Sequence, residues 1–64
     1  MHEVTTYIDG KKYILHLNYN HISYLQEILD DWNFIKEYKI VMSDGSSFII
    51  SKKDGDEIMQ YIKF

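Results

Sequence analysis

The chain reads YIDGKKYIL at residues 7–15 and MSDGSSFII at residues 42–50. Both stretches contain an apolar residue, one variable residue, Asp-Gly, two polar residues, an aromatic residue and two aliphatic residues. Asp-Gly between alternating segments is a strong short-range signal for a β-hairpin. Both central residues of a type I′ turn have positive φ, which Gly adopts freely and Asp tolerates. Each stretch therefore predicts a hairpin.

The first hairpin is predicted to have strands near residues 2–8 and 12–18, joined by Asp9-Gly10. A two-residue turn sets Val4 opposite Leu15 and Thr6 opposite Tyr13, and side chains alternate between the faces of the sheet. The face expected to pack on the core consists of Val4, Thr6, Ile8, Tyr13, Leu15 and Leu17. The opposite face consists of Glu3, Thr5, Tyr7, Lys12, Ile14 and His16.

The second hairpin is predicted over residues 38–43 and 46–51, joined by Asp44-Gly45. The same turn geometry sets Val41 opposite Phe48 and Ile40 opposite Ile49. One face then holds Val41, Phe48 and Ile50. The other holds Tyr38, Ile40, Met42 and Ile49, so both faces of this hairpin are apolar.

A helix is predicted after each hairpin. Residues 20–37 place apolar side chains at three-to-four spacing, with Asn20 as the N-cap. These side chains are Ile22, Leu25, Ile28, Leu29, Trp32 and Ile35. Residues 54–64 begin with Asp54 and have Glu57 three residues later, which is the capping-box pattern. The inward stripe of this second helix is predicted to be Ile58, Tyr61 and Ile62.

The expected fold is α+β: a ββαββα tandem repeat of hairpin-helix units over residues 1–36 and 37–64. Neither unit can bury its apolar sheet face alone. Two units side by side form a four-stranded antiparallel sheet with two helices packed on one face. The alternative is a chance recurrence of a common turn motif. The 64 residues form one domain in either case.

Composition limits the classes of function. The chain has no Cys, and its seven basic residues are all Lys, with a formal charge of −3. A small core without disulfides is often supplemented by oligomerisation. The acidic balance and the lack of Arg disfavour nucleic acid as the partner. No segment has the pattern of a membrane span or a signal peptide, so we expect a soluble, cytoplasmic protein.

Enzymatic and metal chemistry are not expected. His2, His16 and His21 lack the spacing of metal ligands, and His16 is predicted to face Glu3 across the first hairpin as a solvated pair. Ser23 lies two residues after His21, and residues two apart on a helix point in different directions. A chain of 64 residues rarely encloses a substrate. We therefore predict no enzyme activity, cofactor or small-molecule substrate.

Charged side chains suggest two further surfaces. Glu27, Asp30 and Asp31 form an acidic run that either docks a basic partner or is a solvated helix face, and the second interpretation is favoured. Phosphate contacts from lysines and stacking by Tyr7 would suit a small nucleic-acid-binding regulator. The lysines concerned are Lys11, Lys12, Lys52 and Lys53.

The uncovered sheet face is the main candidate site. If both helices cover the opposite face, one apolar patch remains in solvent, and such a patch usually marks an interface. Its residues are Tyr7, Ile14, Tyr38, Ile40, Met42 and Ile49. A homodimer or a different protein can cover it. Alternatively, one helix lies on each face and no patch remains.

The sequence therefore predicts a non-enzymatic protein-interaction module, expected to form a homodimer and to inhibit or regulate its partner. The nucleic-acid-binding regulator is the alternative. The composition, rich in Lys, Ile, Tyr and Asn without Pro or Cys, resembles that of accessory proteins carried by phages and mobile elements. That resemblance implies a short chain that binds and blocks a host protein.

Overall fold

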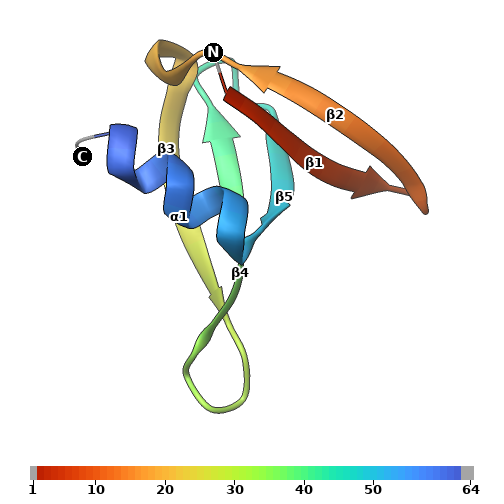
Figure 1. The fold of residues 1–64 in the computed structure, drawn as a ribbon, viewed down its shortest axis with the longest axis vertical. Helices are drawn as coiled ribbons and strands as arrows, with labels where there is room; N and C mark the ends of the chain where they lie inside the picture. Colours follow the sequence, from red (N-terminus) through yellow and green to blue (C-terminus); the bar gives the residue numbers. More distant parts are fainter. Residues whose placement is uncertain (1, 63–64) are drawn as a thin grey trace.

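A computed structural model describes residues 2–62 of the chain, and it contains two separate sheets and one α-helix (Figure 1). Strands β1 and β2 form a two-stranded sheet, and β3, β4 and β5 form a three-stranded sheet in that order. The elements in chain order are β1 (His2–Ile8), β2 (Lys11–Leu17), the 3-10 helix η1 (Tyr19–His21), β3 (Ile22–Leu29), β4 (Ile35–Met42), β5 (Ser47–Ser51) and α1 (Lys52–Tyr61).

The first hairpin is confirmed, including its register. Val4 lies opposite Leu15, and Thr6 lies opposite Tyr13. Asp9 and Gly10 have φ values of 51° and 80°, as a type I′ turn requires. On the predicted inner face, Val4, Thr6 and Leu17 are buried and Leu15 packs against the core, whereas Ile8 and Tyr13 near the turn are exposed.

The second hairpin forms with a different register from the one predicted. Its turn is one residue longer than predicted. The Gly45 amide donates to the Met42 carbonyl (3.0 Å), and the Met42 amide donates to the Ser46 carbonyl (2.8 Å). Gly45 has φ 91°. This is a type I turn followed by a left-handed bulge residue. Ile40 therefore lies opposite Phe48 instead of Ile49. A shift of one residue exchanges the two faces of a strand, so Ile40 and Tyr38 point into the core.

The helix predicted over residues 20–37 is wrong. Residues 19–21 form η1, and residues 22–29 form β3, which pairs with β4. The register of β3 shifts between Ile22 and Tyr24 and again between Ile28 and Leu29. The first irregularity lets Ile22 and Leu25 share the inner face at a spacing of three, whereas Ile28, three residues after Leu25 in regular pairing, lies on the opposite face. All three are partly buried, so partly buried apolar residues recur every three positions. That spacing imitates one face of a helix.

The helix at the C-terminal end is confirmed, but it begins earlier than predicted. Its N-cap is Ser51, whose hydroxyl accepts from the Asp54 amide (3.1 Å), and α1 runs from Lys52 to Tyr61. Ile58 is buried and Ile62 packs against the core, whereas Tyr61 is exposed. Residues 63–64, which the prediction included, lie outside the described residues.

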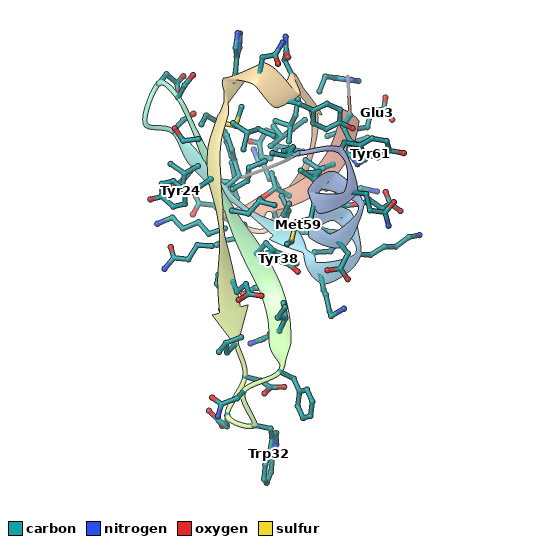
Figure 2. The ribbon with its side chains drawn as sticks, turned by 90° about the vertical axis from the view of Figure 1, so that its left-hand side faces the viewer. Glu3, Tyr24, Trp32, Tyr38, Met59 and Tyr61 are labelled. Atoms are coloured by element: carbon teal, nitrogen blue, oxygen red, sulfur yellow. The ribbon has the colours of Figure 1, made fainter. Side chains whose placement is uncertain are left out.

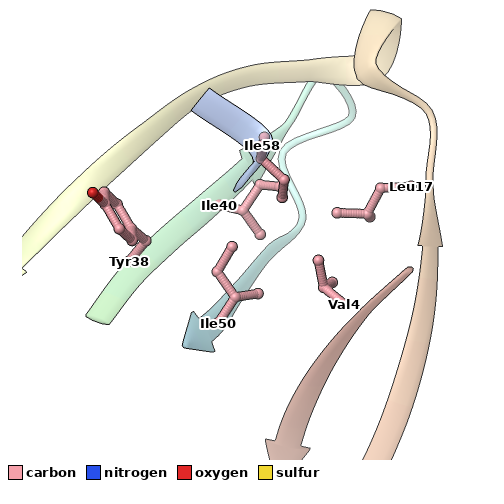
Figure 3. Packing of buried hydrophobic residues seen from close by; sticks show 6 residues of the cluster. All are labelled: Val4, Leu17, Tyr38, Ile40, Ile50 and Ile58. Atoms are coloured by element: carbon pink, nitrogen blue, oxygen red, sulfur yellow. The ribbon is translucent and has the colours of Figure 1, made fainter. Parts of the chain in front are cut away.

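The fold is α+β, but the predicted four-stranded sheet with two helices on one face is wrong. A strand follows the first hairpin where the tandem repeat requires a helix, and the two hairpins belong to different sheets. One core lies between the β1–β2 hairpin, the inner face of the three-stranded sheet and α1 (Figure 3). Its buried apolar residues are Val4, Leu17, Tyr38, Ile40, Ile50 and Ile58.

Gly55 lets α1 lie close to the three-stranded sheet. It is buried, and a Cβ atom at this position would overlap the aromatic ring of Tyr38. The Tyr38 hydroxyl donates to Asp56 Oδ1 (2.7 Å), one residue further along the helix. β4 therefore holds α1 by ring packing and by a hydrogen bond.

Candidate functional site

The predicted open face is divided between core and surface. Tyr38 and Ile40 are 2% and 0% exposed, and Met42 packs against the core, so the expected exposure of Tyr38 and Ile40 is wrong. The cause is the turn at Asp44-Gly45, which shifts the β4–β5 register. Tyr7, Ile14 and Ile49 are exposed as expected.

Tyr7 and Ile49 line an open groove of about 670 Å³ between β1 and β5. The two strands are joined by a hydrogen bond from Thr6 Oγ1 to the Ile49 carbonyl (2.6 Å). The Thr5 amide donates to Asp54 Oδ2 of α1 (3.2 Å). We name this the β1–β5 groove; its lining residues are Thr5, Tyr7, Glu37, Ile49, Ile50, Ser51 and Asp54.

The histidines are dispersed. His16 faces Glu3 across the first hairpin as predicted, with 3.5 Å between Nδ1 and Oε1, and both side chains are exposed. The His2 ring is held by Tyr19, whose hydroxyl lies 2.8 Å from Nδ1, and Tyr19 stacks on Tyr61 of α1 at 5.6 Å. Within residues 2–62, no group of three His, Asp or Glu side chains is arranged to hold a metal ion.

The predicted charged surfaces lie on different elements. Glu27 is on β3, while Asp30 and Asp31 lie in the β3–β4 turn, so these three residues do not share a helix face. Lys11 and Lys12 begin β2, and Lys52 and Lys53 begin α1. Lys52 Nζ is 2.7 Å from Asp56 Oδ2, so one of the four lysines already has a carboxylate partner.

Exposed apolar side chains gather at the β3–β4 turn and the adjoining end of β3, where the helix prediction expects Leu29 and Trp32 on the buried stripe. Trp32 is 80% exposed, Phe34 is 70% exposed, and Leu29 beside them is also exposed. Figure 2 shows Trp32 at the far end of the hairpin, away from the rest of the molecule. We name Leu29, Trp32 and Phe34 the aromatic tip.

Asp30 fixes the conformation of the aromatic tip. Its Oδ1 accepts from the amides of Trp32 (2.8 Å) and Phe34 (3.0 Å), and its own amide donates to the Phe34 carbonyl (2.8 Å). The Asn33 amide donates to the Asp30 carbonyl (3.1 Å), and Asn33 has φ 66°, a conformation that Asn tolerates well. Asp and Asn at the first and fourth turn positions, between apolar segments, were the sequence signal for this turn.

A second groove lies between β3 and α1, with a volume of about 580 Å³. Burial and the hydrogen bond to Asp56 raise the pKa of Tyr38 to about 12, so its hydroxyl remains a hydrogen-bond donor at neutral pH. Hydrogen bonds from Lys52 and Tyr38 lower the pKa of Asp56, which therefore stays ionised. We name this the β3–α1 groove; its lining residues are Tyr24, Leu25, Gln26, Glu27, Tyr38 and Met59.

No family model, curated protein or solved structure matches this chain. A function must therefore follow from the chemistry of its own surface. In the described residues, no helix has the length and apolar character needed to cross a bilayer.

Proposed function

We propose that this chain is a small protein-interaction module that inserts the aromatic tip into an apolar pocket of a partner protein. Trp32 and Phe34 are exposed in the turn between β3 and β4, and Trp32 lies at the projecting end of this hairpin (Figure 2). This exposure carries the proposal. Trp is the residue most enriched among those that dominate binding energy at interfaces, and such residues fill pockets on the partner.

The turn supports this role because the tip is already ordered. Asp30 holds the amides of both Trp32 and Phe34, so binding does not have to order the loop. Association loses free energy whenever a flexible loop becomes fixed, and a preformed loop avoids much of that loss.

The charge beside the tip indicates the character of the partner's surface. Asp30 and Asp31 are adjacent at the turn, and the whole chain has a net charge of −3. A pocket with Lys or Arg at its rim would attract this tip and speed association. The acidic cytoplasmic face of a membrane would repel it. We therefore favour a protein with an apolar pocket and a basic rim.

Capture from a native lysate tests this function when three baits are compared: wild type, Trp32→Ala and Tyr13→Ala. Tyr13 is an exposed aromatic residue on the other sheet and serves as the matched control. We expect the partner to bind wild type and Tyr13→Ala and to be lost with Trp32→Ala. Equal recovery with all three baits would contradict the proposal.

The other predictions remain untested. Homodimerisation is predicted through the six-residue apolar patch, of which Tyr7, Ile14 and Ile49 are exposed. It predicts a mass that rises with concentration and changes little with salt. The nucleic-acid alternative predicts salt-dependent binding of an oligonucleotide that weakens when Lys11 and Lys12 are replaced. A non-enzymatic role, inhibition of a host protein and a cytoplasmic location also stay predictions.

A further inference from the structure

β3 is an edge strand whose outer side lacks a neighbouring strand in its sheet. It pairs with β4 alone in the order β3–β4–β5. The pairing is regular from Tyr24 to Ile28, and both irregularities lie at the ends of the strand. Exposed edges are commonly blocked by Lys, Pro or a central bulge, but the regular segment has Glu27 as its one charged residue. Its backbone is therefore suited to pair with another extended chain.

The β3–α1 groove runs beside this edge. Four consecutive β3 residues, 24–27, line it, and Met59 of α1 and Tyr38 of β4 complete it. Figure 2 shows Met59 and Tyr38 on the side of β3 that faces α1, and Tyr24 on the other side of the strand. Met59 is exposed, and a Met side chain adapts its shape to different apolar groups. A strand added to β3 would direct every second side chain into this groove.

The two inward-facing residues of the regular segment differ in character. Leu25 lies opposite Ile40 and Glu27 lies opposite Tyr38, so both point to the side of the sheet that α1 covers. Glu27 has no ion-pair partner among residues 2–62. Asp56 places a second carboxylate at the Tyr38 hydroxyl. The groove thus has an apolar position at Leu25 and an anionic position at Glu27.

We propose that the β3–α1 groove binds an extended peptide of a partner protein, which pairs antiparallel with β3 and places a Lys or Arg opposite Glu27 and an aliphatic residue opposite Leu25. Antiparallel pairing is the more stable arrangement, and it reverses the order of the opposing residues. From its N-terminal to its C-terminal end, the bound segment therefore has a basic residue opposite Glu27, any residue next, and an aliphatic residue opposite Leu25. This mode of recognition takes affinity from the backbone and specificity from alternate side chains.

A second copy of this chain fits the edge less well. If two β3 strands paired about Gln26, the centre of the regular segment, each Leu25 would face a Glu27 of the other copy. Both copies also carry a net charge of −3. A basic side chain of a bound peptide forms an ion pair with Glu27, whereas pairing of two copies places Glu27 opposite the apolar Leu25.

A charge-swap titration tests the proposal. The probes are the capped peptide Thr-Val-Lys-Thr-Ile-Thr-Val and its counterpart with Glu in place of Lys. NMR chemical shifts of the backbone amides report the site and the affinity of each peptide. They are measured on protein labelled with nitrogen-15, as wild type, Glu27→Lys, Met59→Ala and Trp32→Ala. Circular dichroism confirms that each variant is folded.

We expect the Lys peptide to shift the amides of residues 24–28 and α1 in wild type and in Trp32→Ala. Glu27→Lys should weaken its binding about tenfold or more and should favour the Glu peptide, and Met59→Ala should weaken both peptides. No binding at millimolar concentration, shifts confined to another surface, or an unchanged preference in Glu27→Lys would overturn the proposal. Loss of binding in Trp32→Ala would assign the peptide to the aromatic tip and also overturn it.

Discussion

The ring of Tyr38 lies against Gly55, so that β4 and α1 approach each other at a position where no side chain fits. In an exposed helix interior, Gly→Ala raises the free energy of unfolding by ~1 kcal/mol, because Ala loses less backbone entropy. Here the added Cβ would overlap the Tyr38 ring and separate the helix from the sheet.

Gly55→Ala should therefore lower the free energy of unfolding. Urea denaturation followed by circular dichroism measures this change, and Gln60→Ala on the exposed surface of α1 is the control, with an expected effect close to zero. A stabilised Gly55→Ala variant would show that α1 does not rest on β4.

Ile40→Lys tests the register of the second hairpin. Ile40 is buried between the sheet and α1, and an unpaired ammonium group there loses its hydration without gaining a partner. We expect this variant to be unfolded by circular dichroism at all protein concentrations. Ile49→Lys, which places the same charge on the exposed face of the neighbouring strand, should fold and melt close to wild type. The reverse result would restore the register in which Ile40 lies on the outer face.

Tyr38 makes the fold sensitive to alkaline pH. Its pKa rises from 10.0 to about 12 in the folded chain, first because of burial and then because of the bond to Asp56. The unfolded chain therefore ionises this phenol first, so the contribution to stability is complete below pH 10 and is lost as the pH rises to about 12. Tyr38→Phe cannot ionise. Its melting temperature should thus fall less steeply over this range than that of wild type, and parallel curves would contradict this cause.

The first hairpin could be predicted in register because Asp9-Gly10 forms the whole turn. Asp44-Gly45 is the same dipeptide, but there the glycine occupies the bulge position after a type I turn. The Asp44 carboxylate accepts from the Ser46 amide (2.9 Å) and hydroxyl (2.6 Å), which supports this longer turn. The dipeptide alone did not distinguish the two turns, and the difference of one residue reversed the predicted faces of β4.

The error over residues 20–37 had another cause. One irregularity lets Ile22 and Leu25 share the inner face of β3, and Ile28 lies on its outer face, so apolar residues from both faces recur at helical spacing. Apolar periodicity alone cannot distinguish this pattern from an amphipathic helix. The helix prediction therefore places Leu29 and Trp32 of the aromatic tip on its apolar stripe. The β3–α1 groove is lined by Glu27 and Met59, which lie far apart in the sequence. Their proximity depends on how α1 packs against the sheet, which sequence periodicity does not predict.

Asp30→Ala should loosen the aromatic tip. The substitution removes one acceptor from the amides of both Trp32 and Phe34 and should cost ~1 kcal/mol or more of stability. Fluorescence anisotropy of Trp32 should fall because the indole gains local motion. Asp31→Ala removes a neighbouring exposed carboxylate and should leave the anisotropy unchanged. Equal anisotropy in both variants would mean that Asp30 does not order the tip.

Trp32 is the one tryptophan of the chain, so its fluorescence reports on the aromatic tip alone. The binding role of the aromatic tip is tested most directly by acrylamide quenching of this fluorescence, in the free protein and in complex with the protein recovered by the capture experiment. The partner's tryptophans, where present, are replaced by Phe. We predict ready quenching of a water-exposed indole in the free chain, followed by a blue shift and strong protection in the complex. An indole already protected in the free chain, or one still fully quenched in the complex, would contradict the assignment of the tip as the binding surface.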